Sequence, residues 1–302
     1  MIKTVTVINH LGESLKLELA RPEESGFVVK KIEGLGPSKA DILTTEVITN
    51  DGSVFNFARS EQRDITITLD FSYFTSIEDA RHETYKYFPT RKPLDLIIET
   101  DNRRVRTKGY VESNEPDIFS KKEGCQISII CPDPNFYLDG DTEGALLNGV
   151  RKNFEFPFEN NSLIEPLIEF GAIQYKKEEN VYYDGDSDIG VTITIDAIGE
   201  AENITIYNTG TRQVMRIDTD KIAAITGSGI ISGDRITICT EKGYKSITLL
   251  RGGDEYNILN CLAKNVDWFH LTKGDNVFAF AAERGTVNIQ MVITYRVIYE
   301  GV

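Results

Sequence analysis

Alternation of apolar and polar residues with a period of two constrains the fold of this chain more than any other feature. Clear examples are the segments 64–71 and 191–196, in which isoleucine, valine and leucine alternate with threonine and aspartate. Successive side chains of a strand point to opposite faces, so this pattern is typical of strands with one buried face. The segment 287–299 alternates over a longer span and predicts one long strand. We therefore expect a mainly β protein.

Further strands are predicted wherever short apolar runs are bounded by turn residues. These runs span 1–8, 14–19, 27–33, 94–100, 104–112, 125–131, 203–207, 235–239, 245–250 and 276–281. Only one segment clearly predicts a helix: Ser76 can cap it, Asp79 takes the capping-box position, and Pro89 ends it. The regular spacing of the turn signals favours sandwiches or barrels.

A break in the alternation between Pro132 and Asn161 predicts a domain boundary. A chain of 302 residues is long enough for two domains. We expect an N-terminal domain at 1–137, a linker at 138–161 and a C-terminal domain at 162–302.

The charge balance argues against a protein that binds nucleic acid through its phosphates. The chain has 33 Lys and Arg against 47 Asp and Glu, a formal net charge of -14, and the acidity is shared about equally between the two halves. Phosphate binding requires clustered lysine and arginine, which release the counterions of the nucleic acid.

The start of the chain predicts a strand and not a targeting segment. No apolar run approaches the roughly 18 residues of a membrane span, so we expect no membrane anchor and folding in a cytoplasm. The 4 cysteines fit a reducing compartment. Cys125 and Cys131 lie on one predicted strand, too far apart along it to form a disulfide.

Patterns for catalysis are absent from the sequence. His10, His82 and His270 are the only imidazoles, and neither an HExxH nor a Gly-x-Ser-x-Gly motif occurs. The glycines of 227–233 lack the strand-to-helix context of a phosphate loop, and two turns between strands explain them better. We expect no enzyme activity and no cofactor.

Two acidic runs have the spacing of a calcium loop but lack its essential ligand. The runs begin at Asp139 and at Asp184, and the twelfth position, which must supply a bidentate carboxylate, is Val150 in the first and Ile195 in the second. Solvated turns explain both runs better, and we expect no metal site.

Two further features are candidates for binding. Arg104, Arg106 and Lys108 share one face of a predicted strand, where they could contact a phosphate backbone, protect a solvated sheet edge or contact an acidic neighbouring subunit. Trp268 could stack on a sugar ring, although the alternation around it favours at least partial burial.

Several sequence motifs closely resemble those of the siphophage distal tail protein family. In the first half they include Gly34, Leu35, Gly36 and Pro37 within 32–37, and also 40–42, 44–46, 51–56, 58–59, 63–67, 77–81, 87–89, 93–94, 109–112, 114–120 and 126–134. In the second half they are 233–234, 245–249, 257–260, 268–271, 274–276 and 295–302. The resemblance covers 26–134 and 229–302.

The resemblance implies a virion component that forms a ring, usually hexameric, between the tail tube and the tail tip. It implies an N-terminal β-sandwich or split barrel with one helix, followed by a galectin-like β-sandwich that serves as a docking platform. The implied partners are other copies of the chain, the tail tube protein, the tape-measure protein and the tip hub, fibre or receptor-binding proteins. The implied location is the virion tail, after assembly in the cytoplasm of the bacterial host.

Specific residues can be assigned expected roles within such a ring. Unpaired strand edges and the turn Gly34, Leu35, Gly36 and Pro37 are expected at the subunit interface, together with the stripe Arg104, Arg106 and Lys108. An acidic channel would let DNA pass without specific binding. The alternative function is a carbohydrate-binding protein that recognises a cell-wall glycan through the C-terminal domain, with Trp268 as the stacking surface.

Overall fold

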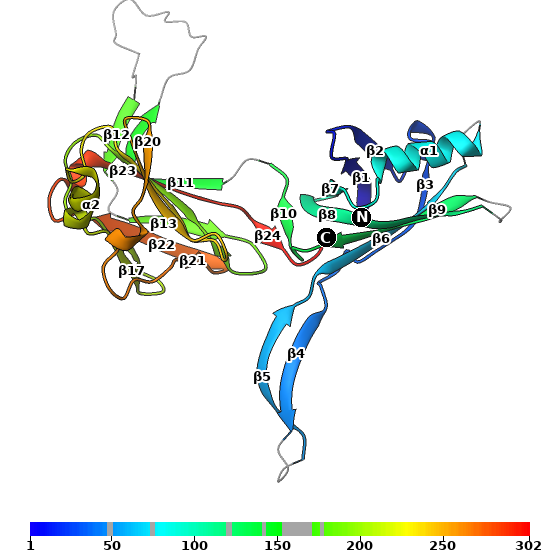
Figure 1. The fold of residues 1–302 in the computed structure, drawn as a ribbon, viewed down its shortest axis with the longest axis horizontal. Helices are drawn as coiled ribbons and strands as arrows, with labels where there is room; N and C mark the ends of the chain where they lie inside the picture. The colour runs from blue at the N-terminus through cyan, green and yellow to red at the C-terminus, as the bar shows by residue number, and fades with distance from the viewer. Residues whose placement is uncertain (47–50, 73–75, 119–122, 141–142, 153–170, 176–177) are drawn as a thin grey trace, which may run out of the picture. The chain divides into compact units, whose positions relative to one another are not determined.

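The computed structural model describes residues 1–46, 51–72, 76–118, 123–140, 143–152, 171–175 and 178–302 (Figure 1). The chain divides into two compact units, the first formed by residues 1–140 with 298–302 and the second by 141–297. Both units are built from antiparallel sheets, which confirms the predicted mainly β fold. Within the described ranges, no helix combines the length and apolar character needed to cross a membrane.

The first unit is organised around one nine-stranded sheet. Seven of its strands follow the order β2-β1-β7-β8-β9-β6-β3, and β10 pairs with both β8 and β24. The strands are β1 (Ile2–Ile8), β2 (Ser14–Glu18), β3 (Val28–Glu33), β6 (Arg63–Asp70), β7 (Pro93–Thr100), β8 (Arg104–Asp117), β9 (Gly124–Cys131), β10 (Phe136–Leu138) and β24 (Ile298–Tyr299). The unit also contains the separate two-stranded sheet of β4 (Ala40–Glu46) and β5 (Ser53–Ser60), the 3-10 turn η1 (Pro22–Glu24) and the helix α1 (Ile77–Tyr87).

The period-two pattern produces the core of this unit. Ile65, Ile67 and Leu69 of β6 are at most 1% exposed, and each such side chain contributes about 1.5–3 kcal/mol when it is fully buried. Helix α1 begins where the capping signal predicts, because the side chain of Ser76 accepts a hydrogen bond from the backbone N–H of Asp79. Its buried residues Ala80 and Thr84 anchor it in the unit.

The second unit is a sandwich of two main sheets. The seven-stranded sheet has the order β12-β11-β23-β15-β18-β19-β20, the four-stranded sheet has the order β13-β22-β16-β17, and β14 pairs with β21. Tyr183 of β13 packs edge-on against Tyr295 of β23 with 6.0 Å between ring centroids, joining the two sheets. The strands are β11 (Glu143–Lys152), β12 (Gly171–Tyr175), β13 (Glu178–Tyr183), β14 (Ile189–Gly190), β15 (Thr192–Ala197), β16 (Thr205–Asn208), β17 (Gln213–Arg216), β18 (Arg235–Cys239), β19 (Ser246–Arg251), β20 (Asp254–Asn257), β21 (His270–Leu271), β22 (Gly274–Ala281) and β23 (Ile289–Tyr295).

A second helix, α2 (Thr219–Thr226), was not predicted from the sequence. The carboxylate of Asp218 caps it by accepting hydrogen bonds from the N–H groups of Asp220 and Lys221, and Gly227 ends it in the left-handed conformation at φ 83°. These are ordinary helix boundaries, but eight residues give too short a pattern for periodicity to reveal. Two 3-10 turns, η2 (Leu259–Cys261) and η3 (Thr286–Asn288), complete the unit.

The prediction of one long strand over 287–299 was wrong. The segment starts within η3, continues as β23, and ends as β24, which pairs with β10 in the first unit. The physical reason is that Val297, Ile298 and Tyr299 are all buried, so alternation stops before the segment ends. The chain thus leaves the first unit at residue 140 and returns to it at residue 298. Residues 143–152 of the expected linker form β11, which pairs with β23.

All four cysteines are free thiols, and three of them are buried. Burial raises the pKa of Cys125 to about 12 and that of Cys131 to about 11. Cys239 is only half-buried. Because the thiolate is the reactive form, the native protein holds the two cysteines of β9 in an unreactive state.

We predict that iodoacetamide at pH 8 alkylates Cys239 well before Cys125 or Cys131, as measured by mass spectrometry of the native protein. The raised pKa values also predict that stability falls as the pH rises above about 8.5, because the thiols of the unfolded chain then ionise while those of the folded chain do not. Alkylation of Cys125 at the same rate in buffer as in urea would contradict this description of the core.

Candidate subunit interface

The two-stranded sheet of β4 and β5 is the most exposed regular element of the first unit. We call these two strands the arm; they are inserted between the paired strands β3 and β6 and extend away from the main sheet (Figure 1). All eight residues of β5 are exposed, as are six of the seven residues of β4. An isolated two-stranded hairpin is marginally stable in water, so the arm needs a covering surface to be well ordered.

Apolar side chains cover much of the arm. Phe55 is 61% exposed and Phe57 is 51% exposed, and Leu43, directly opposite Phe57 in the strand pairing, is 49% exposed. Ile42 and Val54 are likewise exposed. Five large apolar side chains on one exposed hairpin are typical of a protein–protein contact, since the unpaired edges of the hairpin also offer backbone hydrogen bonds.

The turn Gly34, Leu35, Gly36 and Pro37, expected at an interface, lies between β3 and the arm. Gly34 has φ +85°, and a Cβ atom on it would lie 1.9 Å from the carbonyl oxygen of Asp64. Only glycine therefore fits at this position without a backbone shift. The turn sets the path by which the chain leaves the main sheet, and its residues are exposed except for half-buried Leu35.

The basic stripe of β8 lies on the exposed face of an interior strand. Arg104 pairs with Asp139 at 2.7 Å and Arg106 with Asp95 at 2.7 Å, while Lys108 has no ion pair in the part of the chain that the structure describes. Since β8 has β7 on one side and β9 and β10 on the other, the stripe is not a sheet edge. Two of its three charges are balanced within the chain, which leaves little net positive charge for a phosphate backbone.

Trp268 lies in the second unit and is half-buried. The ammonium group of Lys245 sits 5.1 Å from the centroid of its ring. A sugar ring would have to displace this cation in order to stack on the same face.

The glycine-rich segment 227–233 is organised by an arginine and not by a phosphate. The Arg251 guanidinium forms an ion pair with buried Asp234 and donates hydrogen bonds to the carbonyl oxygens of Ser228 and Gly229. It also donates to the hydroxyls of Thr226 and Ser228. The segment therefore turns around the Arg251 side chain of β19, but it lies between α2 and β18, whereas the sequence predicts turns between two strands.

The remaining acidic and imidazole side chains do not gather into a site. Among the described residues, no three His, Cys, Asp or Glu side chains lie close enough together to hold a metal ion. Asp139 is the partner of Arg104, and Lys273 lies 3.6 Å from Asp186 in the second acidic run. The side chains of Asp141, Glu143 and Val150 lie outside the described residues. His270 is 3.3 Å from the side chain of Gln213, and His10 and His82 are exposed.

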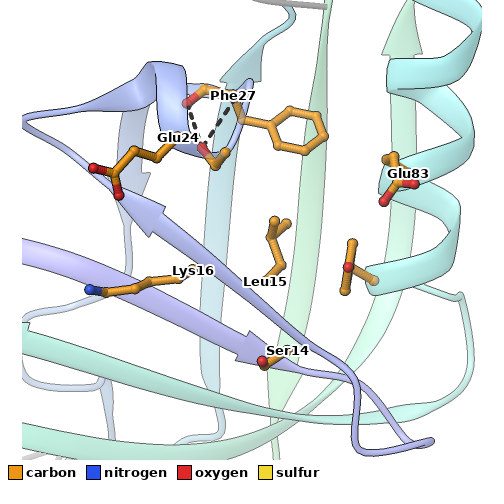
Figure 2. Close-up of a pocket in the computed structure, with 8 residues that line it drawn as sticks. Ser14, Leu15, Lys16, Glu24, Phe27 and Glu83 are labelled. Carbon is orange, nitrogen blue, oxygen red and sulfur yellow. Dashed lines mark hydrogen bonds between the residues drawn. The ribbon is translucent and has the colours of Figure 1, made fainter.

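A groove beside α1 is bordered by β2, η1 and the residues between η1 and β3 (Figure 2). Leu15 and Phe27 line it, and Glu24 and Glu83 contribute carboxylates. Glu24 pairs with Arg21 at 2.6 Å, and the ammonium of Lys16 pairs with Glu18 at 2.5 Å. The other lining residues are Ser14, Lys16, Ser25 and Tyr87.

The strands of the arm are not among those that the sequence pattern predicts. Their segments match motifs of distal tail proteins, but exposed apolar residues on both strands do not give the pattern of a half-buried sheet. A hairpin could have been predicted here from two runs rich in β-branched and aromatic residues, 40–46 and 53–60, with the turn residues Asp51 and Gly52 between them.

No family model and no curated protein matches the sequence. Among solved structures, the chain is similar to the crystal structure of the SPP1 Dit (gp 19.1) protein, described as a paradigm of the hub adsorption apparatus in phages that infect Gram-positive hosts. The TM-score is 0.63 at 12% identity, over 97% of this chain and 99% of that chain. This likeness confirms the fold that the resemblance to distal tail proteins predicts.

Two chains of the phage p2 baseplate in its activated conformation also match. The baseplate structure with Sr gives a TM-score of 0.45 at 10% identity, over 96% of this chain and 97% of that chain. The structure with Ca gives 0.45 at 11% identity, over 98% of each chain.

The geometry at Gly34 predicts that Gly34→Ala destabilises the first unit by about 3 kcal/mol, because the backbone of β6 must move in addition to the cost of the left-handed conformation. Gly12→Ala is the matched control, since Gly12 has φ +82° but open space around it. It should cost about 1 kcal/mol. Urea unfolding measures the free energy of unfolding of both variants. Equal losses of stability would show that the close approach of residue 34 to Asp64 has no energetic consequence.

Proposed function

We propose that this protein is a structural component of a bacteriophage tail tip, a hub that connects the tail tube to the adsorption apparatus. The observation that carries the proposal is the fold, which matches the SPP1 Dit protein over nearly the full length of both chains. Function does not follow from fold alone, and the exposed arm supplies the independent support from this chain. The protein then resides in the virion tail after assembly in the cytoplasm of the bacterial host.

The arm supports assembly into a ring of identical subunits. A ring closes when each subunit presents one surface to its neighbour and accepts the neighbour's equivalent surface at a different place. The exposed apolar side chains of Leu43, Phe55 and Phe57 suit such a head-to-tail contact, because burial in the next subunit removes them from water. In the proposed hub the ring is hexameric, and the turn Gly34, Leu35, Gly36 and Pro37 directs the arm.

The proposed partners are the tail tube protein, the tape-measure protein and the tip hub, fibre or receptor-binding proteins. The first unit contacts the ring neighbours, and the second unit serves as the docking platform. The stripe Arg104, Arg106 and Lys108 belongs to the first unit and is proposed as a subunit contact. Its arginines already have acidic partners, so we assign it a smaller role than that of the arm.

Net charge is consistent with a ring through which DNA passes. Six copies would carry a formal charge of -84, six times -14. An acidic channel wall would repel phosphates and would not retain DNA during passage. This role is one of structure and not of catalysis. The glycan-binding alternative gains no support from Trp268, whose ring is partly buried and covered by Lys245.

The arm is the element that we expect assembly to need most. Replacing Leu43, Phe55 and Phe57 together with serine should weaken self-association by about a hundredfold or more, because the apolar centre of the contact is lost. Sedimentation velocity over a range of concentrations, with electron microscopy of the particles, measures this effect.

A matched control replaces three large side chains of the second unit, which are at least as exposed on average, with serine. Ile198, Val287 and Tyr244 are 57%, 60% and 75% exposed, and this variant should assemble like the unmodified protein. The proposal is contradicted if the arm variant forms the same ring as the unmodified chain, or if the unmodified chain forms no ring either alone or in tail preparations.

A further inference from the structure

Arg63 is a buried charge at the base of the arm. It is the first residue of β6, directly after the arm returns to the main sheet, and it is only 2% exposed. Its guanidinium forms no ion pair within the described residues, and burial lowers its pKa. Such a group is costly to bury unless hydrogen bonds satisfy its N–H donors.

Backbone carbonyls from three separate segments supply those hydrogen bonds. The guanidinium donates to the carbonyl oxygens of Gly34 at 2.6 Å and of Gly36, both in the turn that leads into the arm. It donates to Pro134 at 2.7 Å and to Glu300 at 2.6 Å. It also lies 4.3 Å from the ring centroid of buried Phe136.

The third segment reaches this site only after the whole second unit has been traversed. Within 298–302, β24 pairs with β10, and the N–H of Val302 donates to the carbonyl oxygen of Leu35 at 3.0 Å. A Cβ on Gly301 would lie 3.2 Å from that same oxygen, so the two segments are in close contact. The Arg103 guanidinium lies 4.2 Å from the ring centroid of Tyr299.

The rigid fork of a guanidinium makes these contacts interdependent. Its five donors have fixed directions, and its charge cannot be removed by deprotonation in a protein. If the segment 298–302 is absent, one donor loses the Glu300 carbonyl and water can reach the guanidinium. The remaining carbonyls, including those of the turn that leads into the arm, are then held less firmly.

We propose that Arg63 is a positioning residue that fixes the direction of the arm only when residues 298–302 have returned to the first unit. The inference rests on the proposed ring function, because it assigns the arm to a contact with a second copy of this chain. A chain in which those residues have not yet returned presents a loosely held arm. Incompletely synthesised or misfolded copies are thereby kept out of the ring.

Two spin labels within the first unit can test the position of the arm in the full chain. They are attached at Asn56→Cys on the arm and Asn102→Cys in the exposed turn before β8, in a background with Cys239→Ser, since the other three cysteines are buried. Pulsed electron spin resonance gives the distribution of distances between the labels. We expect Arg63→Met, and separately removal of residues 300–302, to broaden this distribution about twofold.

Arg251→Met is the matched control, because Arg251 also organises glycine turns but lies in the second unit. It should leave the width of the distribution unchanged. If Arg63→Met does not fold, the variant lacking residues 300–302 tests the inference alone, since it retains Arg63 and β24. A distribution as narrow as that of the unmodified chain in the variants that fold would overturn the inference.

Self-association of the same variants separates this inference from the ring proposal. We expect both first-unit variants to assemble about tenfold more weakly than the unmodified chain. A broad distribution with undiminished assembly would show that the ring contact does not depend on how firmly the arm is held, which would overturn the proposed link between Arg63 and assembly while leaving the ring intact. If the unmodified chain itself does not assemble, the ring proposal fails, and so does the part of the inference that concerns assembly. The distances between the labels still show whether Arg63 holds the arm in place.

Discussion

The hydrogen bonds of one buried guanidinium, that of Arg63, hold together the base of the arm in the first unit. Arg63 joins the turn before the arm, the segment before β10 and the returning segment 298–302, through carbonyl oxygens alone. Because no carboxylate forms an ion pair with the guanidinium within the described residues, the buried charge depends on the several carbonyls that point toward it. The first unit includes residues 298–302 as well as residues 1–140, and Arg63 is one of the residues that join the two stretches.

The second unit also contains an arginine that donates hydrogen bonds to turn carbonyls, but there a carboxylate balances the charge of the arginine. Arg251 also collects the carbonyls of a glycine-containing turn, but Asp234, 2% exposed, balances its charge. The ion pair makes that site self-sufficient within a few strands of one sheet. Among the described residues, Arg63 has no ion pair of this kind, and its hydrogen bonds go to backbone carbonyls of three separate segments. This difference explains why we assign a role in assembly to the first site and a purely structural one to the second.

The sequence predicts those features of the fold that depend on residues close together in the chain, such as individual strands and helix caps. The period-two pattern located the core strand β6, and the Ser76 cap located α1. Contacts across the chain could not be predicted in this way, since the Arg63 guanidinium bonds to Glu300, 237 positions away. The strands of the arm could not be predicted from the alternation of apolar and polar residues, because their apolar residues face solvent in the single chain. Of the predicted interface residues, the turn Gly34–Pro37 lies at the base of the arm, whereas Arg104 and Arg106 have partners within the chain.

We expect the exposed arm to be covered by a second copy of the chain in the assembled protein. Hydrogen–deuterium exchange at the backbone amides of β4 and β5, compared between the assembled and the monomeric protein, tests it most directly. These amides should exchange slowly in the assembled particle and fast in the monomer, because a neighbouring subunit would remove the hairpin from water. Equally fast exchange in both forms would show that the arm stays in solvent and would contradict the account.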